Sequence, residues 1–235
     1  MHGASALLVY YADRRELADD FVAQFVTTAD RQRCEAAAHP RRRAECLAGR
    51  ALLRHALEQF TGRSAQSHEL SAAPEGKPVC AGGPAITLSH SGDILVCAVA
   101  AAGDVGVDVE TRKPRTAAGT LAAQHFTPYE AAWIEEDPDR RFQMLWVLKE
   151  AYLKALGVGL AGGLRSLECR IEPPAIEARV AAGSAAPQLA LYAGQDSFVG
   201  VALRGEPRRA IRIARWMAGG AEDSCGPFAL VAATA

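Results

Sequence analysis

Apolar positions recur along the chain with two different periods, which predicts a mixture of helices and strands. Spacings of three and four residues, as at Leu53, Leu57 and Phe60, are typical of helices that bury one face. We expect helices over residues 14–25, 28–38, 41–60, 116–124, 128–137 and 141–156. Short β-branched and aromatic runs predict strands at 7–11, 86–88, 94–100, 105–109, 167–171, 189–192, 198–203 and 210–216.

Two helical hairpins in this pattern resemble each other, one in each half of the chain. The string Val26–Asp30 aligns with Phe126–Glu130, and a threonine can cap the helix in both. Further on, Arg50 aligns with Lys149, each before a similar apolar segment. A genuine repeat would mean two related lobes with a binding site between them, and chance similarity is the alternative.

Composition and charge narrow the class of protein. Of the 235 residues, 49% are hydrophobic and 23% are charged, which is typical of a globular protein with a sizeable core. The formal net charge of -1 provides no basic surplus for capturing nucleic acid, so we expect no nucleic-acid partner. The apolar run 6–11 is too short to span a bilayer and lacks the basic flank of a signal peptide, which indicates a cytoplasmic protein with no membrane segment.

The six cysteines form no recognisable metal or disulfide pattern. They are Cys34, Cys46, Cys80, Cys97, Cys169 and Cys225. None belongs to a C-x-x-C pair or lies near histidines at zinc spacing. A chain of this length does not need disulfides, so we expect free thiols; a secreted, disulfide-bonded form is the alternative.

The string Gly106-Val107-Asp108-Val109-Glu110 places two carboxylates close together in a predicted strand. Alternate side chains share a face, so Asp108 and Glu110 should project together while the valines between them face the core. Neighbouring carboxylates repel each other, and a set of oxygen ligands suits a hard cation such as Mg²⁺. The alternative is a solvated strand face.

The predicted helix 141–156 carries another acid, Glu150, one turn before Lys154. Its apolar stripe predicts the buried face, and the stripe consists of Phe142, Leu145, Trp146, Leu153 and Leu156. An ordinary surface ion pair is one interpretation of Glu150 and Lys154. The other is that Glu150 completes a three-carboxylate site, beside which Lys154 neutralises phosphate charge or moves a proton.

Two further features suit an anionic ligand. The string 89–92, Ser-His-Ser-Gly, is expected to form a turn between two strands, where His90 can donate to a phosphate. Arg42 and Arg50 lie two turns apart on one predicted helix and, together with Arg33 and Lys77, can hold phosphates. An exposed histidine and a solvated helix face are the alternatives. No G-x-S-x-G elbow surrounds the serines, which argues against a nucleophilic triad.

Together these strings resemble the 4′-phosphopantetheinyl transferase superfamily, in its large, surfactin-synthetase-activating (Sfp) type. The family pattern G-x-D-x-E occurs at 106–110, and W-x-x-K-E-A-x-x-K occurs intact at 146–154, with the family spacing between them. The strings at 76–78 and 89–92 are also similar to family elements. The resemblance covers residues 5 to 203.

The resemblance implies an α+β fold with two similar α/β lobes related by a pseudo-twofold axis in one chain. The lobes would be residues 1–103 and 104–235, with a basic extension from about 204, and coenzyme A would bind between them. The implied reaction transfers the 4′-phosphopantetheine arm of coenzyme A to a serine of an apo acyl or peptidyl carrier protein and releases adenosine 3′,5′-bisphosphate. A monomer that serves secondary metabolite biosynthesis is expected.

The resemblance also implies roles for individual residues. Asp108, Glu110 and Glu150 match the ligands of Mg²⁺ or Mn²⁺, and Glu150, Lys154 and His90 match catalytic groups. Coenzyme A contacts are implied for Arg33, Arg42, Arg50, Lys77, Ser89, His90 and Lys154, of which the three arginines would hold the 3′-phosphate. Two alternatives remain open: a catalytically silent homologue that binds carrier or coenzyme A, and a Mg-dependent pyrophosphate hydrolase.

Overall fold

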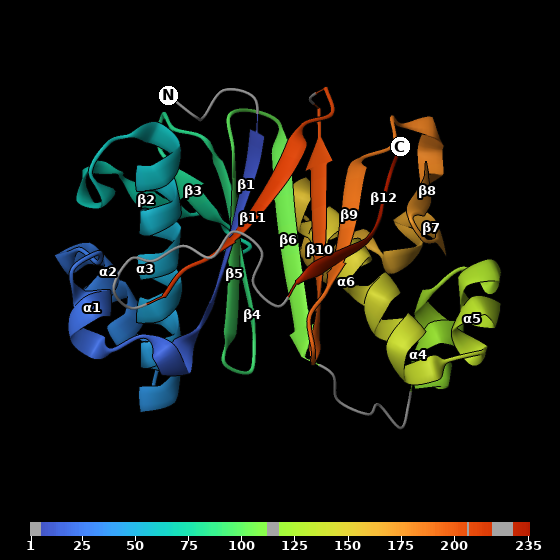
Figure 1. Cartoon of the computed structure of the whole chain (residues 1–235), viewed down its shortest axis with the longest axis horizontal. Coiled ribbons are helices and arrows are strands. Elements are labelled where there is room, and N and C mark those ends of the chain that lie inside the picture. The colour runs from blue at the N-terminus through green and yellow to red at the C-terminus, as the bar shows by residue number, and fades with distance from the viewer. Residues whose placement is uncertain (1–5, 112–117, 206, 218–227) are drawn as a thin grey trace. The chain divides into compact units, whose positions relative to one another are not determined.

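The structure, a computed structural model, describes residues 6–111, 118–205, 207–217 and 228–235 (Figure 1). Over these residues the fold is a mixture of six α-helices and twelve strands, and the strands form three sheets. The chain divides into two compact units. Unit 1 comprises residues 1–102 and 209–226, and unit 2 comprises residues 103–208 and 227–235.

Unit 1 is a four-stranded sheet with a long helix on one face, α3 (Pro40–Thr61) (Figure 1). The strand order is β11-β1-β5-β4, with bounds Ala210–Arg215, Ala6–Asp13, Ile94–Ala100 and Ala85–Ser91. The short helices η1 (Arg14–Glu16), α1 (Asp19–Ala23), α2 (Thr28–Glu35) and η2 (Ala65–Ser67) and the hairpin β2 (Leu70–Ala72)–β3 (Pro78–Cys80) complete the unit. Pro40 occupies the first turn of α3, and Gly62 ends it with a φ of 70° that favours glycine.

Unit 2 is a six-stranded sheet packed against helix α6 (Pro138–Leu156) (Figure 1). The strand order is β6-β10-β9-β12-β8-β7, with bounds Asp104–Thr111, Ser197–Arg204, Gln188–Ala193, Ala229–Ala233, Ala175–Val180 and Leu167–Glu172. Helices α4 (Ala118–His125) and α5 (Pro128–Glu135) pack on α6, and three short 3-10 helices, η3 (Gly159–Gly162), η4 (Leu164–Ser166) and η5 (Ala181–Gly183), lie in the connections.

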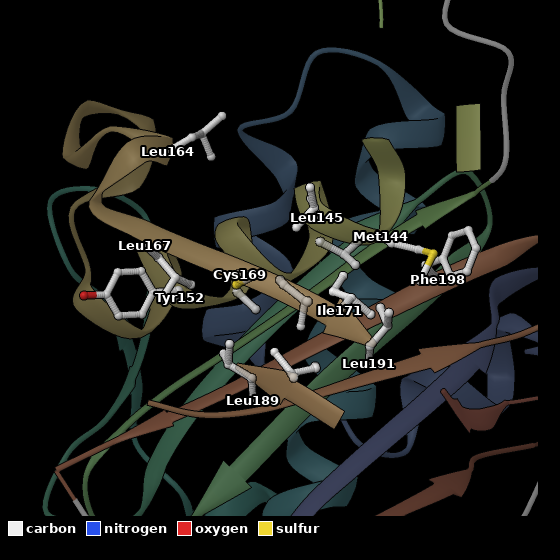
Figure 2. Packing of buried hydrophobic residues seen from close by; sticks show 14 of the residues in the cluster. Met144, Leu145, Tyr152, Leu164, Leu167, Cys169, Ile171, Leu189, Leu191 and Phe198 are labelled. Carbon is white, nitrogen blue, oxygen red and sulfur yellow. The ribbon is translucent and has the colours of Figure 1, made fainter. Parts of the chain in front are cut away.

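The hydrophobic core of unit 2 joins α6 to the sheet. Figure 2 shows its side chains closely packed, among them Met144, Leu145, Tyr152, Leu167, Ile171, Leu189, Leu191 and Phe198. The predicted stripe of α6 lies in or against this core, with Phe142, Leu145 and Leu153 fully buried. The helical spacing in the sequence therefore identified the buried face of α6 correctly.

Each unit contains a capped helix whose acidic third residue pairs with a buried cation on the long helix. In α2, Thr27 and Asp30 form a capping box, and Asp30 pairs with Arg54 at 2.5 Å and with Arg50 at 3.0 Å. In α5, Thr127 and Glu130 form the same box, and Glu130 pairs with Lys149 at 2.8 Å. These ion pairs fix the short helix to the long helix in each unit.

Several expectations from the sequence are wrong. Cys34 and Cys46 form a disulfide between α2 and α3, whereas free thiols were expected. Spacing did not reveal it, because the two cysteines lie twelve positions apart in sequence and only the packing of the two helices brings their Cα atoms to 5.6 Å. Cys80, Cys97 and Cys169 are free and buried, and Cys225 lies outside the described residues.

The backbone also differs from expectation in three places. The helix predicted at 14–25 is divided into η1 and α1, because Leu17 and Ala18 are extended. Strand β4 continues to Ser91, so Ser89 and His90 lie in a strand and the turn comes after them. Strand β11 belongs to unit 1 instead of the second lobe, because it pairs in parallel with β1.

Candidate functional site

The carboxylates of β6 lie on the strand face that α6 covers. A Cβ atom at Gly106 would lie 1.9 Å from the Ala151 carbonyl oxygen, so the side-chain direction at Gly106 points at α6. Asp108 and Glu110 share that face because alternate residues do. The valines of the strand are buried on its other face. The two faces are therefore divided as the sequence predicted, and because α6 covers the carboxylate face, Asp108 is buried and Glu110 is half-buried.

Two glycines allow α6 to lie this close to the sheet. Gly106 of β6 lies under the backbone of Ala151 and Ala155, and Gly200 of β10 lies under that of Val147, where a Cβ atom would be 2.3 Å from the carbonyl oxygen. Gly200 is also the residue directly opposite Asp108 in the β6–β10 ladder. The close approach of helix and strands places the residues of α6 beside Asp108.

Lys154 of α6 binds the strand carboxylate directly. Its Nζ donates to Asp108 Oδ1 at 2.6 Å, and Asp108 is only 5% exposed. Glu150 lies one turn before Lys154 on the same side of α6. Lys154 therefore pairs with a carboxylate of the neighbouring strand, and it also lowers the pKa of Glu150 on its own helix.

The electrostatics of Glu150 show that Asp108 and Glu110 act on its carboxyl group. Burial raises the pKa of Glu150, and the Asp108 carboxylate raises it further. Lys154 acts in the opposite direction, and Glu110 adds to the increase. Glu150 therefore holds a proton more readily than an exposed glutamate, as a group that accepts a proton during a reaction requires.

The three acids are hard oxygen donors, although no group of three or more His, Cys, Asp or Glu side chains in the described part of the chain is arranged so that it could hold a metal ion. The carboxylates of Asp108 and Glu110 on β6 raise the pKa of Glu150 on α6, an effect that a cation would reverse. The Lys154 ammonium already supplies one positive charge at Asp108. In chemical type, the oxygen donors are therefore those that a divalent ion such as Mg²⁺ prefers.

Lys149 has a role that the sequence did not reveal. Its side chain is fully buried, pairs with Glu130, and donates to the carbonyl oxygens of Leu164 and Leu167. These contacts fix α6 against α5, against η4 and against the first residue of β7. They therefore also fix the backbone at the neighbouring Glu150. The signal was present in the alignment of Lys149 with Arg50, since each pairs with the acid of a capping box.

The other predicted site residues belong to unit 1. His90 is exposed and Ser89 is buried in β4, and Lys77 is half-buried in the turn before β3. Arg33 is exposed on α2, and Arg42 is exposed near the start of α3. Arg50 is only 7% exposed and pairs with Asp30, so Arg42 and Arg50 do not form one exposed face, although they lie two turns apart.

Comparisons with known proteins cover both units. Residues 104–196 match a family model described as the 4′-phosphopantetheinyl transferase superfamily, and residues 30–100 match one described as the 4′-phosphopantetheinyl transferase N-terminal domain. The first of these segments contains Asp108, Glu110, Glu150 and Lys154, and the second contains Arg33, Arg42, Arg50, Lys77, Ser89 and His90.

Individual relatives carry the same description. The 4′-phosphopantetheinyl transferase HetI of Nostoc sp. is 32% identical over 143 residues, which are 57% of this chain and 60% of that protein. A 4′-phosphopantetheinyl transferase of Bacillus subtilis is 30% identical over 160 residues, 66% of this chain and 70% of that protein. The 4′-phosphopantetheinyl transferase psf-1 of Bacillus pumilus is 34% identical over 131 residues, 53% of this chain and 55% of that protein. The chain thus spans about half to about two thirds of the relatives that it matches. None of the helices in the described ranges is both long and apolar enough to cross a membrane.

Proposed function

Because the chain belongs to the 4′-phosphopantetheinyl transferase superfamily, we propose that it transfers the 4′-phosphopantetheine arm of coenzyme A to a serine of an apo carrier protein. The serine oxygen forms a bond to the phosphorus of the arm, the pyrophosphate P–O bond breaks, and adenosine 3′,5′-bisphosphate leaves. The observation that carries the proposal is the group formed by Asp108, Glu150 and Lys154, which lies inside the segment that matches the superfamily.

Each charged residue of this group would have its own task. Glu150, whose pKa is raised by burial and by Asp108, would accept the proton of the serine hydroxyl. Lys154 would place its ammonium against the charge that develops on the leaving phosphate. Asp108 holds Lys154 in position through the 2.6 Å ion pair.

Asp108, Glu110 and Glu150 would hold a divalent cation, Mg²⁺ or Mn²⁺. When bound, the ion neutralises the dense negative charge of a pyrophosphate. It would also relieve the repulsion among the three carboxylates, which is the physical reason to expect it at these residues.

Unit 1 would bind the nucleotide part of coenzyme A, with Ser89, His90 and Lys77 as phosphate contacts and with Arg33, Arg42 and Arg50 toward the 3′-phosphate. We further propose that the two units are related lobes of a pseudo-twofold fold. The capping box with a buried cation partner, found once in each unit, supports this relation. A cytoplasmic monomer that modifies acyl or peptidyl carriers of secondary metabolism completes the proposal.

Mass spectrometry of an apo carrier protein tests the function. We would incubate the carrier with the chain, coenzyme A and Mg²⁺, and we expect the carrier to gain the mass of one phosphopantetheine arm. Asp108→Asn should lose this activity. Asp104→Asn is the matched control, since Asp104 lies on the same strand but is exposed and pairs with Arg204 at 3.5 Å. No mass gain on several carriers, or release of the arm into water, would count against the transfer reaction.

A further inference from the structure

Helix α3 carries a buried acid, Glu45, just after its basic cluster, Arg41, Arg42 and Arg43. Glu45 is 7% exposed although three arginines precede it in sequence. Its Oε1 accepts from Arg41 Nε at 3.0 Å, and its Oε2 accepts from Arg42 Nη1 at 3.1 Å. Both carboxylate oxygens are thus committed to the guanidinium groups that would otherwise face a phosphate.

The same acid lies next to His90. Strand β4 packs on α3 with the Leu88 side chain 3.0 Å from the position of a Cβ at Gly49. Glu45 lies one turn before Gly49 on α3. His90 lies two residues after Leu88, on the same face of β4. Burial raises the pKa of Glu45, but Arg41, Arg42 and His90 lower it by more, so that the carboxyl is held ionised. Glu45 therefore presents a fixed negative charge to three of the positive or protonatable groups of unit 1.

Arg50, the remaining arginine of α3 in the predicted phosphate set, also has an acidic partner, which it shares with Arg54. Asp30 pairs with Arg50 at 3.0 Å, and both side chains are at most 8% exposed. The carboxylates of Glu45 and Asp30 therefore offset part of the positive charge of this cluster, in which Glu45 pairs with Arg41 and Arg42 and Asp30 pairs with Arg50 and Arg54. A phosphate that entered this cluster would have to compete with two carboxylates already in place.

We propose that Glu45 determines nucleotide specificity by offsetting the cations that would select for the 3′-phosphate of coenzyme A, so that this chain also accepts 3′-dephospho-coenzyme A. The inference rests on the proposed function. In this variant of the reaction the serine oxygen bonds to the same phosphorus, the same pyrophosphate bond breaks, and adenosine 5′-monophosphate leaves instead of the bisphosphate. The serine proton is taken up as before, so the step needs no additional reactant.

The test compares kcat/KM for coenzyme A and for 3′-dephospho-coenzyme A with one apo carrier. For the unaltered chain we expect the two values to agree within roughly fivefold, because both carboxylate oxygens of Glu45 already accept hydrogen bonds from Arg41 and Arg42. Glu45→Gln removes the offsetting charge and should raise the preference for coenzyme A by roughly tenfold, mainly through KM. Glu35→Gln, at an exposed acid at the end of α2, makes the same charge change and should leave the ratio unaltered.

Calorimetric titration measures the affinity of the unaltered chain for each nucleotide. This second measurement needs no variant, so it remains informative if Glu45→Gln does not fold. Similar affinities for the two nucleotides support the inference. A preference for coenzyme A of about a hundredfold, the size expected when charged hydrogen bonds to a phosphate are lost, would overturn it. Transfer from neither nucleotide would instead contradict the proposed function, so the two failures are distinguishable.

Discussion

Gly106→Ala inserts a methyl group where β6 and α6 are in direct contact. The new Cβ atom would lie 1.9 Å from the Ala151 carbonyl oxygen and 2.5 Å from the Ala155 nitrogen. Both neighbours are backbone atoms of a helix, so neither can rotate away. Since ordinary van der Waals contact begins near 3.4 Å, the helix has to move from the strand by about 1.5 Å.

This displacement has a cost in stability and a cost in activity. Overpacking a core usually costs about 1–3 kcal/mol, and we expect about 3 kcal/mol or more here because the clash is with backbone. The same movement separates Glu150 and Lys154 from Asp108. A misplacement of roughly 1 Å can cost about a hundredfold in rate, so the transfer activity of any folded Gly106→Ala protein should fall by about that factor.

Urea unfolding followed by tryptophan fluorescence measures the stability change, and the carrier assay measures the rate. Gly119→Ala is the matched control, because Gly119 lies in helix α4 with no atom within 4 Å of its potential Cβ. That control should be neutral or stabilising by up to about 1 kcal/mol. A Gly106→Ala protein that loses less than about 1 kcal/mol and keeps its activity would refute the close packing of strand and helix.

Three further changes test other parts of the structure. Lys149→Met should lower the free energy of unfolding in urea by about 3–5 kcal/mol, because Glu130 is left buried without its cation. Adding Glu130→Gln should restore part of this loss. No recovery in the double variant would contradict the pairing. Trp216→Ala should lower the free energy of unfolding by about 3–5 kcal/mol, because Trp216 is 1% exposed and packs on Phe21 and Phe25 in unit 1. A melting temperature equal to that of the unaltered chain would contradict the packing of Trp216 on unit 1. Burial raises the pKa of Asp30, but hydrogen bonds from Arg54 and Thr27 leave it below its ordinary value, so its stabilisation is present at neutral pH and is lost as pH falls through the folded-state pKa. Asp30→Asn should therefore flatten the acid side of the stability–pH curve, and an unaltered slope would disagree with this.

The long elements and the motif residues could be predicted from the sequence, because each left a local signal. Helix α3 follows from its apolar spacing, the proline at its start and the glycine at its end. The strand β6 follows from its alternation of valines with other residues. Sequence patterns predict Asp108 and Glu150 at one site, and the Asp108 carboxylate, which raises the pKa of Glu150, is consistent with that prediction.

Features that depend on packing could not be predicted in the same way. Nothing local marks Lys149 as buried, because its cost of burial is offset by Glu130, nineteen positions earlier in the chain. The burial of Glu45 could not be predicted either, because a single acid after three arginines is typical of a solvated helix face. The short strands β2, β3, β8 and β12 lack a clear alternating pattern, and their pairing partners in the sheets stabilise them.

The central claim is that Asp108, Glu110 and Glu150 bind one divalent cation. Electron paramagnetic resonance of Mn²⁺, titrated into the chain in the presence of coenzyme A, measures this directly through the loss of the free-ion signal. We predict one bound Mn²⁺ per chain, with binding lost in Asp108→Asn and Glu150→Gln but retained in Asp104→Asn. Equal Mn²⁺ binding by the unaltered chain and the first two variants would contradict the claim.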